Sequence, residues 1–105
     1  MLILIPTDSN NIDEAEITLI DNVKYWALLD FNEGKVNKYT FFNTYQEIEE
    51  YMDVLIVKNT KEYVWSLEEL GMAVLVAPFQ NSVEDIMEAF IFKELHDFNN
   101  TYNKA

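Results

Sequence analysis

DVLIVKNTKEYVWSLEELGMAVLVAPFQNS, residues 53–82, is the stretch that decides the fold of this chain. Two short apolar runs lie in it, residues 54–57 and 72–77, and both are typical of strands buried on each face of a sheet. The segment between them is long enough for one helix, so the strands are expected to run parallel in a right-handed crossover. This pattern predicts the α/β class, with helices covering the faces of a sheet.

The segment between these two strands carries start and stop signals for a helix. Asn59 followed three residues later by Glu62 is typical of a helix N-terminus. Gly71 marks the other end, because glycine readily adopts the left-handed conformation that closes a helix. We therefore expect a helix over about residues 60–70.

The first half of the chain is rich in strand patterns. Residues 2–5 form an apolar run that is stopped by Pro6 and opens into a polar loop. Residues 25–31 and 36–42 are separated by a short loop in which Gly34 supplies a positive φ. They predict an antiparallel hairpin whose second, half-exposed strand lies at a sheet edge.

Two further helices are predicted from capping patterns. Thr44 with Glu47 forms a capping box before a short amphipathic segment. Ser82 with Asp85 forms another before a broad apolar stripe, and that helix is expected to end near residue 95 or 97.

The order of these elements predicts one α/β domain over residues 1–97 with a single mixed sheet. Residues 15–20 alternate weakly and fit either a short strand or an extended loop. Residues 98–105, FNNTYNKA, form a polar C-terminal tail.

The composition excludes several classes of function. The chain has 105 residues, half of them apolar, which is enough for one compact core. Seven lysines, no arginine and 19 acidic residues give a net charge of −12, which disfavours nucleic acid and anionic membranes as partners. Without cysteine there are no disulfides and no Cys-ligated metal sites. With no basic leader and no long apolar stretch, a soluble cytoplasmic protein is expected.

Taken together, the pattern resembles a known family. Its most specific parts are LILIPT at residues 2–7, LGMAVLV at residues 70–76, and SVEDIMEAF at residues 82–90 followed by FKEL at residues 92–95. In this order and spacing they resemble the dinitrogenase iron–molybdenum cofactor biosynthesis family, small NifX-like and NafY-like domains that carry or shelter metalloclusters. The resemblance implies a ribonuclease H-like three-layer fold, with a five-stranded mixed sheet flanked by about three helices.

Three elements of that family are replaced in this chain. Family members usually have His-Phe-Gly before the second strand, with His as the candidate cluster contact, and the aligned stretch here is residues 20–22, ending at Asn22. The glycine-rich turns expected after the two parallel strands are replaced by NTK at residues 59–61 and PFQN at residues 78–81. No His or Cys ligand for a cluster is therefore present at these positions.

The candidate ligand site lies at the carboxyl ends of the parallel strands, where ligands of such sheets bind. Two predicted helix N-termini, near Thr60 and Val83, favour an anion there together with Lys58 and Lys61. The candidate cofactor-binding residues are Thr7, Asp8, Ser9, Asn22, Lys58, Asn59, Thr60, Lys61, Gln80, Asn81 and Ser82. The alternative is that Asn59 and Ser82 only cap helices and that the lysines are solvated.

Enzyme chemistry lacks its usual parts in this sequence. No Ser-His-Asp set, Cys/His pair, P-loop or dinucleotide fingerprint is present. His96 is the only histidine and is predicted to end the last helix, where it interacts with the helix dipole and does not bind a metal. Asp8 and Asp30 are a candidate carboxylate pair for a metal-dependent nuclease, which the net charge disfavours.

The expected function is that of a non-enzymatic carrier or chaperone for an anionic metallocluster, the iron–molybdenum cofactor or an iron–sulfur precursor. Its partner would be a cluster-assembly or recipient protein, and we expect a monomer or weak homodimer. The alternative is a protein-interaction or regulatory module on the same fold that has lost the ligand. Aromatic residues such as Tyr39 and Phe41 on the edge strand are more typical of packing, but could also form a contact surface.

Overall fold

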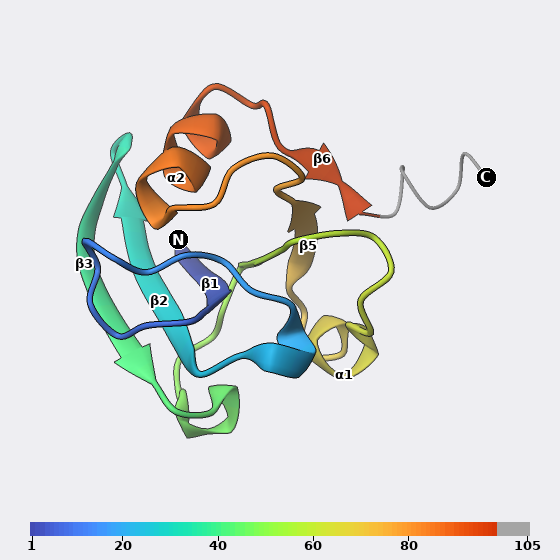
Figure 1. Cartoon of the computed structure of the whole chain (residues 1–105). Coiled ribbons are helices and arrows are strands. Elements are labelled where there is room, and N and C mark those ends of the chain that lie inside the picture. The colour runs from blue at the N-terminus through green and yellow to red at the C-terminus, as the bar shows by residue number, and fades with distance from the viewer. Residues whose placement is uncertain (99–105) are drawn as a thin grey trace.

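The computed structural model describes residues 1–98 of the chain, and its centre is a six-stranded mixed sheet in the order β3-β2-β1-β4-β5-β6 (Figure 1). The strands are β1 (Leu2–Thr7), β2 (Tyr25–Asn32), β3 (Lys35–Phe42), β4 (Val54–Val57), β5 (Ala73–Val76) and β6 (His96–Asp97). The helices of the described residues are α1 (Trp65–Glu68), α2 (Val83–Ile91) and the short 3-10 helices η1 (Ile20–Asn22) and η2 (Tyr45–Glu47). The predicted polar tail lies outside the described residues except for Phe98, which is buried.

The three central strands, β1, β4 and β5, run parallel, and the pair of β4 and β5 is the one that the two apolar runs of residues 53–82 predicted. β1 and β4 are buried on both faces, which is why their sequences are continuously apolar. In β5, by contrast, Val74 and Val76 are buried while Ala73 is exposed. β1 is longer than predicted, because Pro6 does not stop it: Pro6 pairs with Trp26 and the strand continues to Thr7.

The hairpin of β2 and β3 forms one edge of the sheet, as expected. The two loop residues, Glu33 and Gly34, have φ of 56° and 80°, and this pair of positive values is typical of the type I′ turn that suits the twist of a hairpin. A register shift between Asp30 and Phe31 marks a bulge in the ladder.

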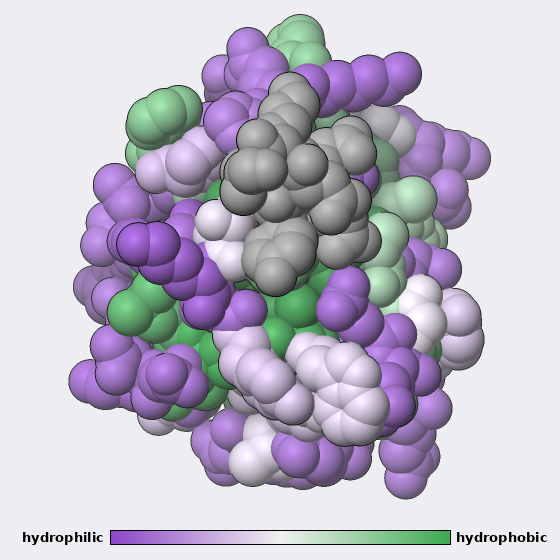
Figure 2. Space-filling model, turned by 90° about the vertical axis from the view of Figure 1, so that its right-hand side faces the viewer, coloured by the Kyte–Doolittle hydropathy of each residue, from purple (hydrophilic) through white to green (hydrophobic). Residues whose placement is uncertain are grey.

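Two apolar clusters occupy the two faces of the sheet. Ile3, Ile5 and Ile56 belong to the cluster that α2 covers. Leu4 and Leu55 belong to the other cluster, which contains residues of α1 and the buried Phe98. Because neighbouring residues of a strand point to opposite faces, the two clusters make a three-layer arrangement of helix, sheet and helix. Figure 2 shows the side where α1 and β6 lie, with hydrophilic side chains surrounding hydrophobic ones.

The helix predicted over residues 60–70 is much shorter than expected. It spans only Trp65–Glu68, and the asparagine that was expected to cap it, Asn59, forms a local turn by accepting the Lys61 N–H at 2.9 Å. Such hydrogen bonds from side chain to backbone compete with helix formation. The predicted stop is confirmed, since Gly71 has φ of 93°.

The other two helix predictions have mixed outcomes. The Thr44–Glu47 box is present, with the Glu47 carboxylate accepting the Thr44 N–H at 3.1 Å, but it closes only the single turn of η2. The Ser82 cap is confirmed: its Oγ accepts the Asp85 N–H at 3.1 Å.

The predicted extension of α2 to residue 95 or 97 is wrong. The helix ends at Ile91, Lys93 adopts a positive φ of 59°, and the chain returns to pair with β5 as β6. The prediction of five strands was therefore one too few, and the described residues contain two α-helices where about three were expected. The extra strand supplies hydrogen-bond partners to the outer edge of β5.

Residues 15–20 form an extended loop, the second of the two predicted possibilities. Isolated bridges join Ile17 to Thr7 and Glu16 to Ser82, while Ala15 and Ile17 are buried. Among residues 1–98, no helix has both the length and the apolar character required to cross a bilayer.

Candidate functional site

The carboxyl ends of β1, β4 and β5 meet at one edge of the sheet, because the three strands are adjacent and parallel. The predicted site residues that follow these strands therefore do lie along a common edge. Their side chains, however, are engaged in hydrogen bonds that shape the edge itself.

The polar residues after β1 build the first loop. Thr7 is fully buried, and its Oγ1 lies 2.8 Å from the carbonyl oxygen of Tyr25 and 3.0 Å from that of Ser9. The Asp8 carboxylate accepts the Glu16 N–H at 3.0 Å, and Ser9 Oγ accepts an N–H from the same loop. These three side chains therefore hold the loop against the sheet.

Glu62 occupies the place where an anionic ligand was expected. Its Oε2 accepts the backbone N–H groups of Lys58 at 2.8 Å and of Asn59 at 3.1 Å, directly after β4. Its Oε1 accepts the N–H of Ile20 at 2.5 Å, from η1. The edge formed by the carboxyl ends of the parallel strands thus already contains a negative group, and that group is the protein's own Glu62 side chain.

Sequence reasoning missed this role of Glu62. The signal for half of it was present, because a glutamate three residues after a capping residue typically accepts the N–H of that residue. The other half, the contact with Ile20, joins residues 42 positions apart and has no local signature.

A shallow pocket of about 230 Å³ lies beside this carboxylate and brings two of the predicted residues together. Asn59 and Lys61 line it, opposite η1, together with the exposed ring of Tyr63. Thr60 is half-buried beside them, while Asn22 is exposed and does not line the pocket.

The residues after β5 have separate roles. Gln80 Oε1 is buried and has no hydrogen-bond partner among the described residues. The Asn81 carbonyl oxygen accepts the Ile17 N–H at 2.8 Å, and Ser82 caps α2. This segment is thus tied to the loop after β1, apart from the pocket at Glu62.

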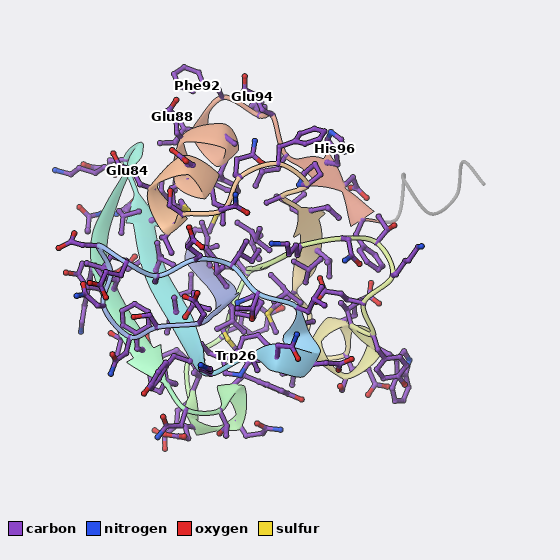
Figure 3. The ribbon with its side chains drawn as sticks, viewed as in Figure 1. Trp26, Glu84, Glu88, Phe92, Glu94 and His96 are labelled. Carbon is purple, nitrogen blue, oxygen red and sulfur yellow. The ribbon has the colours of Figure 1, made fainter. Side chains whose placement is uncertain are left out.

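His96 is not at the end of a helix, as predicted, but in β6, where it is exposed (Figure 3). Its ring lies 6.4 Å from the ring of Phe79, which is 81% exposed at the carboxyl edge. The prediction for His96 was wrong because α2 ends at Ile91, before the chain reaches this residue.

The candidate metal pair of Asp8 and Asp30 does not form. Asp30 pairs with Leu2 at the start of β1, whereas Asp8 follows Thr7 at its end. Since a strand rises about 3.3 Å per residue, the two carboxylates lie at opposite ends of the strand. Within residues 1–98, no group of three or more His, Asp or Glu side chains is placed to hold a metal ion.

No model of a known protein family matches the sequence, and no curated protein matches it. Several solved structures do. The crystal structure of the protein PH0822 has a TM-score of 0.73 and 15% identity, covering 92% of this chain and 96% of that one. The crystal structure of MJ0327 from Methanocaldococcus jannaschii, described as a proposed dinitrogenase, has a TM-score of 0.73 and 18% identity, covering 92% and 93%.

A third structure comes from Thermotoga. The NMR structure of its protein TM1290, described as a proposed NifB protein of the DUF35 family, has a TM-score of 0.69 and 16% identity, covering 91% of each chain. Identities this low speak for the fold and not for a shared activity. The resemblance that the sequence predicted is therefore confirmed at the level of the fold, which this chain shares along nearly its whole length with proteins described as dinitrogenase-like and NifB-like.

Proposed function

We propose that this protein is a cytoplasmic, non-enzymatic accessory protein with a ribonuclease H-like fold that carries or shelters an anionic metallocluster. The cargo would be an iron–molybdenum cofactor or an iron–sulfur precursor, and the partner a cluster-assembly or recipient protein. The fold shared with the dinitrogenase-like and NifB-like structures supports this class of function.

One observation in the site carries the proposal. The backbone N–H groups of Ile20, Lys58 and Asn59 converge on the carboxylate of Glu62, at distances of 2.5 to 3.1 Å. Three donors aimed at one negative group form an anion-binding arrangement. In the unloaded protein Glu62 fills it, and a cluster would bind by displacing Glu62 and contacting the ammonium groups of Lys58 and Lys61.

This mode of binding differs from metal ligation. The edge offers N–H donors and ammonium groups, and the sequence contains no cysteine. The cargo would therefore be held by its negative charge, with an affinity that falls as the salt concentration rises.

The second candidate function is a protein-interaction module that has kept the fold without the cargo. The same carboxylate favours it, because the donors that a cluster would need are already satisfied by Glu62. In this alternative Glu62 is a structural clamp between η1 and the end of β4.

Anaerobic loading separates the two candidates. The protein is incubated with isolated iron–molybdenum cofactor and with reconstituted iron–sulfur species, and iron and molybdenum are measured after gel filtration. The carrier proposal predicts stoichiometric metal that is lost in the Lys58→Glu/Lys61→Glu variant and increased in Glu62→Gln. The matched control is Lys35→Glu/Lys38→Glu, with the same charge change on the distant edge strand β3. A metal-free wild-type protein would refute the carrier and favour the interaction module.

A further inference from the structure

A groove lies at the opposite end of the parallel strands from the candidate ligand site. It has a volume of about 540 Å³ and separates the segment between η2 and β4 from α1. Its apolar lining includes Ile48, Met52 and Leu70, and the last two lie shortly before the amino ends of β4 and β5. No residue of the predicted ligand site contributes to it.

Two large side chains that line this groove are exposed. The side chain of Tyr51 is 71% exposed and that of Leu70 is 47% exposed. The Tyr51 hydroxyl packs against Gly71, at a point that a Cβ on residue 71 would obstruct. On the other wall, the Tyr45 ring packs edge-on against the buried Trp26, with ring centroids 5.5 Å apart. The rings of Tyr45 and Tyr51 therefore bound the groove.

The rim of the groove is negative. Residues 44–53 contain four acidic residues and no lysine, and two of the four are used in hydrogen bonds. Glu47 accepts the Thr44 N–H, and Asp53 accepts the Leu2 N–H at 2.8 Å. Glu49 and Glu50 are exposed, line the groove, and form no hydrogen bond or ion pair within the described part of the chain.

We propose that this groove binds a short segment of a partner protein in which apolar side chains are flanked by arginine or lysine. Exposed tyrosine beside unpaired carboxylate suits a guanidinium or ammonium group, which can stack on the ring and pair with the acid. Aromatic and arginine side chains are also those that dominate binding energy at interfaces. A second copy of this chain fits poorly, because each copy has a net charge of −12 and no arginine.

The proposal can be tested with a synthetic peptide of alternating leucine and arginine blocks, titrated into ¹⁵N-labelled protein. Saturable shifts are expected for residues 45–52 and 66–70, and not for the corresponding peptide in which glutamate replaces arginine. Tyr51→Ala is expected to weaken binding by about tenfold, as for a residue central to an interface. Glu49→Lys/Glu50→Lys should weaken it at least as much, and since neither carboxylate has a partner within residues 1–98 this variant should fold normally.

The matched control is Tyr39→Ala, which removes an exposed tyrosine from β3, and it should bind like the wild type. Shifts spread over the whole acidic surface, with equal affinity for the Tyr51→Ala variant, would overturn the proposal in favour of nonspecific charge attraction. A dimer in sedimentation that Tyr51→Ala abolishes would also overturn it and assign the groove to self-association. Because the readout contains no metal, the outcome is independent of cluster loading.

Discussion

Two groups of polar side chains, one near each end of the parallel strands, differ in what they bind. At the carboxyl end, Thr7, Asp8 and Glu62 each bind backbone groups of the same protein. At the amino end, the carboxylates of Glu49 and Glu50 have no partner within residues 1–98 and flank exposed apolar side chains. A cluster of polar residues in a sequence therefore does not show which side chains of the folded protein are available to bind a ligand. Substitutions of these residues at the carboxyl end should therefore lower the stability of the protein. Substitutions of the two glutamates at the amino end should instead lower the affinity for the partner segment.

The largest effect on stability is expected for Glu62→Ala. It leaves three partly buried N–H groups without their acceptor and should lower the free energy of unfolding by about 2–3 kcal/mol, as for hydrogen bonds to a charged group. Urea unfolding followed by circular dichroism measures this. Glu69→Ala is the control, because that side chain is exposed and forms no hydrogen bond in the described chain. Equal midpoints for the two variants would contradict a clamping role for Glu62.

Thr7→Val should lower the free energy of unfolding by about 1–2 kcal/mol. It removes the buried hydroxyl that hydrogen-bonds to carbonyl oxygens at the end of β1, while the shape of the side chain is kept. The comparison is Thr60→Val, at a predicted site residue whose hydroxyl has no hydrogen bond within the described residues. We expect Thr60→Val to change the unfolding free energy by less than about 0.5 kcal/mol. A reversed order of the two variants would mean that the carboxyl end does not depend on Thr7.

The two predicted helix-capping residues should also differ in how much stability is lost when each is replaced by alanine. Ser82 is a true N-cap, so Ser82→Ala should lower stability by about 1 kcal/mol. Asn59 closes only an exposed turn, and Asn59→Ala should cost less than about 0.5 kcal/mol. Thermal unfolding of both variants under one buffer condition measures the difference. If Asn59→Ala proved the more damaging, the short span of α1 would need another explanation.

The smallest effect on stability is expected at the amino end. Glu49→Gln/Glu50→Gln should leave the free energy of unfolding within about 0.5 kcal/mol of the wild type, since neither carboxylate has a partner in the part of the chain that the structure describes. The same variant should bind the leucine–arginine peptide more weakly. A marked loss of stability would show that these acids have a structural role and would remove the contrast between the two ends.

Much of the central architecture could be predicted from local signals. The apolar runs that became β1 and β4 are buried on both faces, as is typical of strands inside a parallel sheet, and the run that became β5 lies beside them. The β2–β3 hairpin, the stop at Gly71 and the cap at Ser82 each depend on residues close together in sequence. These features were predicted correctly because backbone sterics and nearby hydrogen bonds decide them.

The helix lengths and the candidate site were predicted less well. Helical spacing of apolar residues favoured a short helix after Thr44, a longer helix after Asn59 and an extension beyond Ile91. Short helices are marginal alone, and other contacts replaced them. The candidate site residues were placed along the correct edge. Whether their side chains were free depended on partners that no local pattern contains.

The sequence by itself determined the class of the fold, the parallel strands and the family resemblance, because burial and local conformation leave few alternatives for those segments. Only the tertiary structure decided which groups remain available for binding. It brought Glu62 to Ile20, placed Asp8 and Asp30 at opposite ends of β1, and added β6 beside β5. Each of these arrangements depends on how distant positions in the chain pair in the folded sheet, and no local pattern in the sequence contains that information.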